Sequence, residues 1–382
     1  MLQGLERFLK RRVLPFFLIC FGAIILFIAV FWLKCAFVKP SVGPLPTTIV
    51  REQGTVVPDI GDKNRRPVED TYFSYPEWYI VWSYEERAQY LPKNLPSGFP
   101  YFASIGQYWK SYCFICGLTQ SRHQFNFGDH LSSFVLGGSF ALEYSIRGAY
   151  EQTIGRLSEW TSSHELVEED AYAARVAREY ADFVYIRPFY EFHFAHALAQ
   201  LWKETPLWSK HPIRKWERKF ILSVDYGIEA VYAEAMQLAS HLAYGAESDE
   251  TYTWVENAPE TLFRDFPRIK VDQEKAKEVS RQSYVAIIPR YQEFTDLAVK
   301  LAERDVHFVQ VAGNDEIMVT VVVPSGWTYD VPAGDGTLLF TENVLTQPGA
   351  KRIALECRVR ALPTLIRHFT TGGIKIEHIY DY

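Results

Sequence analysis

The chain has 382 residues, of which 48% are hydrophobic and 23% are charged. These values are typical of folded proteins and exclude extensive disorder beyond the N-terminal fifth. The net charge of −6 argues against a general nucleic-acid-binding protein, because phosphate binding requires a dense basic surface and the sequence has no basic stripe. Aromatic residues make up 15% of the chain, which indicates either a thick helical core or contact with a membrane interface.

The most distinctive segment is Val13–Leu33, in which no charged residue interrupts about 21 positions. At about 1.5 Å of rise per residue, a helix of this length covers roughly 30 Å, the thickness of a bilayer's hydrocarbon core. Residues 1–12 carry four basic side chains and one acidic side chain, so the positive-inside rule predicts a cytoplasmic N-terminal tail and extracytoplasmic domains. The run is too long for an ordinary signal peptide. We therefore expect an uncleaved single-pass transmembrane anchor at residues 13–33.

Five cysteines in a chain of this length do not indicate a disulfide scaffold. Cys35 lies at the end of the predicted anchor. Cys113 and Cys116 form a CxxC pair followed by His123 and His130, which suggests a redox dithiol or a zinc site. Against both, there is no second CxxC, and the histidine spacing fits no common zinc finger. We favour buried cysteines that act as small hydrophobic residues.

Residues 34–70 contain proline, glycine and charged residues without a helical period, which predicts a linker or an extended arm. From residue 71 to residue 270 the apolar spacing is helical, and we predict an aromatic-rich all-α domain of five to seven helices. Capping patterns place helix starts at or just after three residues, namely Ser74, Asp129 and Ser162. A last long helix is expected over Pro212–Tyr244.

Apolar residues spaced by three and four positions define the faces by which these helices are expected to pack. The helix after Asp129 has Val135, Leu142 and Ile146 in this pattern, and the last helix has Phe220 and Ile228. The segment Leu131–Leu142 is too short for a second membrane span, so a core helix is favoured. Partial insertion of the domain into the bilayer interface is the alternative. Four tryptophans are expected mainly in the core: Trp160, Trp202, Trp208 and Trp216.

The pattern changes in the last hundred residues. Residues 283–289 read as a strand, Tyr291–Glu303 as a helix, and the next two strands as a hairpin that turns near Asn314. Further strands follow, and Leu362–Phe369 reads as a helix ended by a glycine pair. The order βαββ…βαβ predicts an α+β ferredoxin-like domain over residues 280–382. In element order this domain is similar to small ligand-binding regulatory domains of the ACT type, and the resemblance implies a small-molecule sensor.

The best constellation of reactive side chains lies in the helical domain. His193 and His196 are at i, i+3, and Asp225 and Glu229 are at i, i+4, so each pair shares one helix face. Two histidines and two carboxylates could bind a divalent metal between helices. However, the Glu-x-x-His pattern of ferritin-like sites is missing, and basic residues such as Arg214 could neutralise the acids instead.

The sequence contains no glycine-rich phosphate loop, nucleophile elbow, HExxH motif or kinase signature. We therefore favour a membrane-tethered interaction or assembly factor outside the cytoplasm, held by Val13–Leu33, with a protein partner or a second copy of itself and no nucleic acid. A metal-dependent enzyme and a small-molecule sensor are the alternatives. Glu143 needs no catalytic role, because Arg147 one helical turn later can pair with it.

Overall fold

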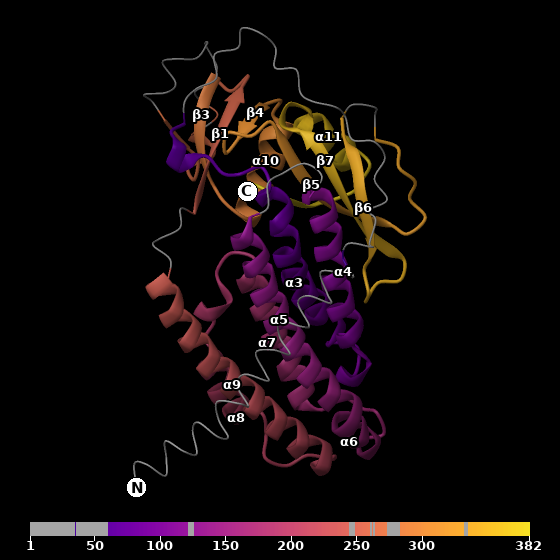
Figure 1. Ribbon diagram of the computed structural model, residues 1–382. Helices are drawn as coiled ribbons and strands as arrows, with labels where there is room; N and C mark the ends of the chain where they lie inside the picture. The colour runs from indigo at the N-terminus through magenta and orange to yellow at the C-terminus, as the bar shows by residue number, and fades with distance from the viewer. Residues whose placement is uncertain are drawn as a thin grey trace, which may run out of the picture.

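The computed structural model describes Cys35 and residues 60–120, 126–243, 249–259, 262, 264–272, 283–331 and 335–382. The predicted anchor Val13–Leu33 and most of the predicted linker lie outside these residues. None of the helices that the structure does describe combines the length and the apolar character that a bilayer crossing requires. The described chain forms a long helical bundle followed by a region of two antiparallel sheets at one end of the bundle (Figure 1).

Seven α-helices are described between residues 70 and 243, as expected for the helical part. They are α3 (Asp70–Tyr90), α4 (Tyr101–Gln120), α5 (Phe127–Tyr150), α6 (Arg156–Thr161), α7 (Glu168–Val184), α8 (Phe194–Glu204) and α9 (Pro212–Ala243). A π-helical turn at residues 151–155 joins α5 to α6, and short 3₁₀ turns occupy residues 62–64, 96–98 and 189–191. The last helix agrees with the predicted one to within a residue.

The three predicted helix starts were wrong, although the helices themselves exist. Helix α3 begins at Asp70, four residues before the predicted start at Ser74. The side chain of Asn126, and not that of Asp129, caps α5 by accepting the Gly128 N–H at 2.9 Å. Similarly, α7 begins after Val167, whose N–H is accepted at 3.1 Å by the Asp170 carboxylate. In α5 the predicted cap, Asp129, lies within the first turn, and in α7 the predicted start, Ser162, lies in the turn that ends α6.

Helix α3 lies at the centre of the bundle and packs against α4, α5 and α7. Its buried aromatic residues recur every three or four positions, so they form one continuous face, which includes Tyr75, Trp78 and Trp82. Buried tyrosines satisfy their hydroxyl groups within the bundle; for example, Tyr108 donates to the Ser133 carbonyl at 2.6 Å. The high aromatic content of the chain therefore serves, at least in α3 to α5, as a packed helical core.

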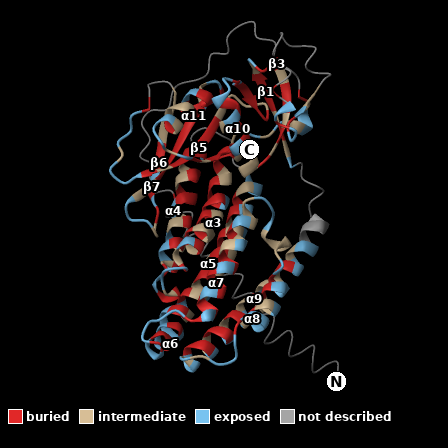
Figure 2. Cartoon of the chain, turned by 180° about the vertical axis from the view of Figure 1, so that it is seen from behind, coloured by how far each residue is buried: buried red, intermediate tan, exposed pale blue. Residues whose placement is uncertain are grey.

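The predicted packing faces of α5 and α9 are not buried in a core. Val135, Leu142 and Ile146 of α5 are exposed, as are Phe220 and Ile228 of α9. The four tryptophans assigned mainly to the core are each at least 40% exposed: Trp160, Trp202, Trp208 and Trp216. The apolar period correctly predicted helices, but the assignment of these positions to the core was wrong. Figure 2 shows the contrast between the buried centre of the bundle and its exposed flanks.

The sheet region begins within the range predicted to be helical. Its elements are β1 (Glu250–Glu256), β2 (Lys270–Val271), β3 (Ser283–Pro289), α10 (Gln292–Glu303), β4 (His307–Val311), β5 (Glu316–Pro324), β6 (Thr337–Asn343), β7 (Ala350–Arg358), α11 (Leu362–Thr371) and β8 (Ile376–Ile379). The strands form two four-stranded antiparallel sheets, in the orders β2-β3-β1-β4 and β6-β7-β5-β8. The predicted single ferredoxin-like sheet is therefore wrong. The predicted hairpin near Asn314 is instead the crossing from one sheet to the other.

The two sheets have the same topology. In the first, β3 and β4 both pair antiparallel with β1, so they run parallel to each other, and α10 connects them. In the second, β7 and β8 both pair antiparallel with β5, and α11 connects them. A shorter strand, β2 or β6, extends each sheet beside β3 or β7. The region is thus an internal repeat of one β-β-β-α-β unit, and a single apolar core spans both copies.

The second sheet is joined tightly to the start of the bundle. The Thr71 hydroxyl on α3 donates to the Tyr380 carbonyl at 3.1 Å and accepts the Met318 N–H at 3.1 Å. The rings of Tyr75 and Phe340 meet edge to face, with their centroids 4.8 Å apart. Aromatic residues of α3 and apolar residues of β5 to β8 therefore share one core, which fixes the bundle against the sheets.

Candidate functional site

The two predicted acidic residues lie in a cluster of charges between α5 and α9. Arg147 of α5 donates to both Asp225 oxygens, at 2.7 and 2.9 Å, and its guanidinium lies 3.8 Å from a Glu229 oxygen. It also pairs with Glu143 one turn earlier on α5, as the spacing predicted. One arginine therefore serves three carboxylates, and the Arg147 side chain is only 11% exposed.

The cluster has more negative than positive charge, and the pKa of Glu229 is shifted as a result. Burial, reinforced by the charge of Glu143, raises the pKa of Glu229 to about 8, while Arg147 opposes the shift. Glu229 is therefore mostly protonated at neutral pH. The cluster can therefore hold a proton at this position and release it in mildly alkaline solution.

The two predicted histidines lie elsewhere. His193 and His196 are exposed on the wall of a pocket of about 340 Å³ between α7 and α8, whose lining also includes Glu179, Glu204 and Arg175. Arg175 pairs with Glu204, and its guanidinium carbon lies 4.9 Å from the Tyr172 ring centroid. The structure thus brings His193 together with His196, and Asp225 with Glu229, but it does not bring the two pairs together.

Metal binding at these residues stays a prediction. Within the described residues, no group of three or more histidine, cysteine, aspartate or glutamate side chains has an arrangement that could hold a metal ion. Asp225 is already bonded to Arg147 through both oxygens. A metal at the acid pair would have to displace the arginine, and a metal at His193 and His196 would need ligands from solvent.

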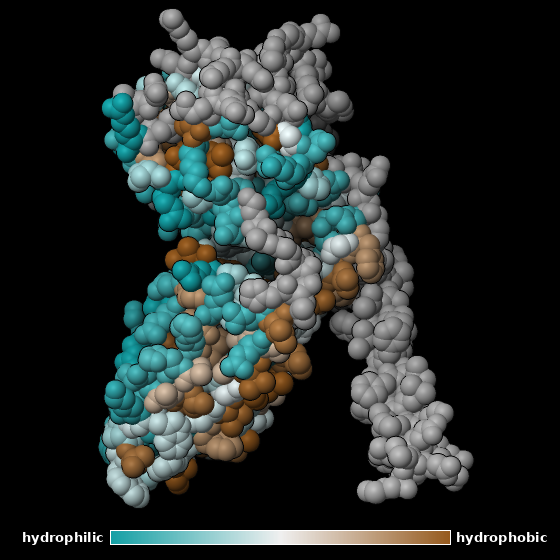
Figure 3. Space-filling model, turned by 90° about the vertical axis from the view of Figure 1, so that its left-hand side faces the viewer, coloured by the Kyte–Doolittle hydropathy of each residue, from teal (hydrophilic) through white to brown (hydrophobic). Residues whose placement is uncertain are grey.

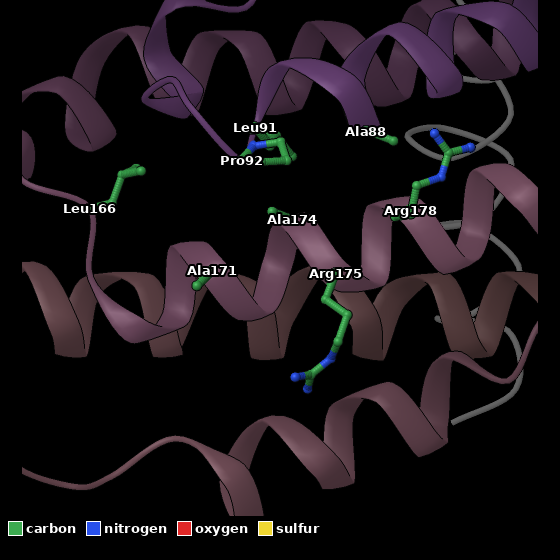
Figure 4. Close-up of a pocket in the computed structure, with 8 residues that line it drawn as sticks. All are labelled: Ala88, Leu91, Pro92, Leu166, Ala171, Ala174, Arg175 and Arg178. Atoms are coloured by element: carbon green, nitrogen blue, oxygen red, sulfur yellow. The ribbon is translucent and has the colours of Figure 1, made fainter.

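A second pocket, of about 350 Å³, lies between the end of α3 and the start of α7 (Figure 4). Its walls are mostly apolar and come from Ala88 and Leu91 on one side and Ala171 and Ala174 on the other. Figure 4 shows that the Arg175 side chain points away from this pocket. It pairs with Glu204 of α8. Arg178, the other charged residue of the lining, pairs with Glu85 and Asp182, so the pocket is an apolar space at whose edge both arginines already have partners.

A larger network of buried charges occupies the end of the bundle away from the sheets. Asp170 of α7 accepts from Arg214 at 3.0 Å and forms an ion pair with Arg218, whose Nε lies 2.9 Å away. Arg218 also donates to Glu151 at 2.7 Å. Glu217 completes the group by accepting from Arg214 at 3.0 Å. All of these side chains are at most 11% exposed. Since each charge has a partner, the network is a structural device that ties α7, α9 and the π-helical turn together.

A buried carboxylate also joins the bundle to the second sheet. Glu342 of β6 accepts from the hydroxyl groups of Tyr75, at 2.8 Å, and Ser111, at 2.5 Å. Burial raises the pKa of Glu342, and the two hydroxyl donors oppose that shift. The sequence analysis missed this contact, because Tyr75 and Ser111 lie 267 and 231 positions from Glu342 in the sequence, and no local pattern connects residues so far apart.

Cys35 and Cys113 form a disulfide that spans 78 positions of sequence. The proposal that Cys113 is a free buried residue was therefore wrong. Cys116 is buried outside any disulfide, with its sulfur 3.9 Å from His130 Nδ1, and burial raises the pKa of its thiol to about 11. A thiol with so high a pKa is a poor nucleophile, so the pair is no dithiol centre. His123 lies outside the described residues.

Comparisons with known proteins add no functional assignment. No protein-family model matches the chain, and neither a curated protein nor a solved structure is significantly similar to it. The function must therefore be argued from the disulfide, the charge clusters and the surface.

Proposed function

We propose that the chain is anchored in a membrane by Val13–Leu33 and that its folded part acts outside the cytoplasm as a tethered interaction or assembly factor. The observation that carries this proposal is the disulfide between Cys35 and Cys113. Disulfides persist in extracytoplasmic compartments and are rare in the cytosol. Because Cys35 follows the predicted anchor by two residues, an oxidising environment must begin directly at the outer end of that anchor.

The arrangement of reactive groups also favours a binding protein over an enzyme. In the described part of the chain, the buried acids are bonded to arginine, lysine, tyrosine or serine side chains, as in the group around Asp170 and Glu342. Such pairing stabilises a shape, and it engages the oxygens that a catalytic base would need to keep free. The metal-enzyme and sensor alternatives stay predictions, because no specific observation favours either.

A topology experiment on the full chain tests the proposal. Membranes from cells that express it are washed with alkaline carbonate, and intact cells are treated with a protease that cannot cross the membrane. We expect the chain to stay in the washed membranes, and the folded part to be cleaved without cell lysis. Release by carbonate would exclude the anchor, and protection of the folded part until lysis would exclude the extracytoplasmic location.

Partner binding requires a separate measurement. The full chain is cross-linked in native membranes, and after solubilisation in detergent its mass is compared with that of the single chain. We expect complexes larger than one copy, with either another protein or a second copy as the partner. A chain that stays monomeric at every cross-linker concentration contradicts the assembly role but leaves the anchor intact.

A further inference from the structure

Two neighbouring helices expose an unusual number of large apolar side chains. We define the α5–α9 face by six of them, with these exposed fractions: Val135 56%, Leu142 64%, Ile146 64%, Phe220 64%, Ile228 64% and Val231 70%. A typical soluble monomer leaves contiguous apolar patches of only a few hundred Å² exposed, and larger patches mark contact surfaces. Figure 3, which looks onto the side of the bundle where α9 lies, shows an apolar band along it.

The six side chains lie on one side of the molecule. Helices α5 and α9 are antiparallel neighbours, joined at one point by Ser139 and Tyr232, whose hydroxyl oxygens are 2.7 Å apart, and at another by Tyr150, which donates to Glu217 at 2.8 Å. At 100° per residue, the exposed apolar positions of each helix lie about a quarter turn from this seam and on the same side of it. They therefore form one continuous surface that is two helices wide.

Helix α9 carries large apolar side chains on its outer side as well as on its inner side, where Leu222 and Tyr226 pack in the core. Arg214 and Arg218 also point into the bundle, with at most 2% of their side chains exposed, while Phe220 and Ile228 point outward. A water-exposed helix keeps its charges, and not its large apolar side chains, on the outer side. Charges directed inward and apolar side chains directed outward are the arrangement found where the surroundings are lipid.

The disulfide places this face beside the predicted anchor. Cys35 packs in a cluster with Cys113 and Phe134, and Phe134 directly precedes Val135 of the face. Cys35 comes only two positions after Leu33, so the two Cα atoms are at most about 7 Å apart. If Leu33 ends the hydrocarbon-spanning run, the α5–α9 face begins within the headgroup layer of the outer leaflet.

Exposed tryptophans near the start of α9 agree with a lipid interface. Trp208 is 79% exposed and Trp160 is 62% exposed. Tryptophan is enriched where membrane and water meet, because its ring is apolar and its N–H is polar. Lys210, whose side chain is 75% exposed, lies close by in sequence and could contact lipid phosphates. A second protein helix packed on this face would not need exposed tryptophan and lysine side chains at its edge, so these residues favour lipid as the occupant.

We propose that the α5–α9 face rests in the outer leaflet of the membrane, with its apolar side chains at the boundary between headgroups and acyl chains. This inference rests on the proposed anchor, because the anchor brings the face to the bilayer. It adds a second membrane contact, which lays the helical bundle along the membrane surface and leaves the helices α7 and α8 toward water.

Spin-label accessibility in the full chain tests the inference. The chain is reconstituted into vesicles of phosphatidylcholine and phosphatidylglycerol, and nitroxide labels are attached to Leu142→Cys, Ile228→Cys and Val231→Cys. Matched control labels are placed on α7 at Glu179→Cys and Asp182→Cys, which lie on the exposed polar side. The signal of the labelled parent chain is subtracted. Relaxation is measured with oxygen, which concentrates in lipid, and with a water-soluble nickel chelate.

We expect the three labels on the face to relax several-fold more with oxygen than with nickel, and the two controls to show the reverse. Labels on the face that respond mainly to nickel would place it in water and overturn the inference. Labels that respond to neither reagent would show protein cover, by residues 13–33 or by a second copy, and would also overturn it. Carbonate extraction of the same vesicles separates these failures from a failure of the anchor, which would release the chain.

Discussion

Replacement of Arg147 by methionine tests the central charge cluster most directly. The substitution keeps most of the side-chain volume but removes the only cation that forms an ion pair with Glu143, Asp225 and Glu229 in the described chain, leaving Arg87 of α3 as a weaker compensating charge. Removal of one partner from a buried ion pair costs about 3–5 kcal/mol. Because these carboxylate side chains are 17–23% exposed, water reaches them, and we expect a loss of about 3 kcal/mol in the free energy of unfolding at pH 8.

The pH dependence separates this mechanism from a simple packing defect. Without Arg147, the repulsion among the three carboxylates in the folded protein is relieved only when they bind protons. The folded state therefore binds more protons than the unfolded state, in which the carboxylates have ordinary pKa values. The loss of stability is therefore largest at pH 8 and becomes smaller as the pH falls toward 5. Urea denaturation of the full chain in detergent, at both pH values, measures it.

A matched control comes from α7. Arg178 also pairs with two carboxylates, Glu85 and Asp182, but its side chain is 37% exposed. We expect Arg178→Met to cost less than about 1 kcal/mol, because exposed ion pairs contribute little. A loss for Arg147→Met that equals that of the control, or that is the same at pH 5 and pH 8, would refute the role of Arg147 as the shared cation.

Three further predictions follow from the same structure. The parent chain should lose stability between about pH 4.5 and pH 8, because a carboxyl group whose pKa is raised in the folded state makes folding weaker as the pH rises. Glu229→Gln should show a smaller loss over this range, and denaturation at pH 5 and pH 9 measures the difference. Cys113→Ser removes a cross-link across 78 positions, so we expect up to about 4 kcal/mol of lost stability and, in the parent chain alone, a lower Tm with a reductant. Metal analysis of the purified chain tests His193 and His196: less than about a tenth of an equivalent would end the metal-enzyme hypothesis.

The sequence predicted which segments are helical better than which side of each helix is buried. In α9, Phe220, Ile228 and Val231 follow a helical period, and that period is correct. However, a hydrophobic period measures only that one side differs from the other. It cannot show which side faces the core, and in α9 the side with Arg214, Arg218 and Leu222 is the buried one. The basic residues at positions 214, 215, 218 and 219 were the available signal.

Local interactions were likewise easier to predict than distant ones. The Glu143–Arg147 pair follows from a spacing of four residues on one helix. The bond from Arg147 to Asp225 joins positions 78 apart, and no local pattern specifies it. The same limit applies to Cys35 and Cys113, since pairing between cysteines depends on the fold and not on their spacing.

In the sheet region, the elements were predicted but their pairing was not. The strand over Ser283–Pro289 agrees with β3 at both ends, and the glycine pair after α11 ends that helix, with Gly373 at a φ of +72°. The strands β4 and β5 are neighbours in sequence and were expected to form a hairpin. They belong to different sheets, because β1, which was not predicted as a strand, pairs with β4, while β7 and β8 pair with β5.

The disulfide also determines which part of the folded chain lies nearest the proposed anchor. Cys113 lies in the half of α4 that contacts the second sheet, where Ser111 donates to Glu342 of β6 two residues earlier. The junction between bundle and sheets is therefore fixed close to the outer end of residues 13–33. A partner that binds the sheet region would then be held at the membrane surface, whereas the charge network around Asp170 lies at the far end of the bundle. Reduction of the disulfide should release the junction between bundle and sheets from the anchor before it disturbs the charge network around Asp170. No residue of that network contacts either cysteine within the described chain.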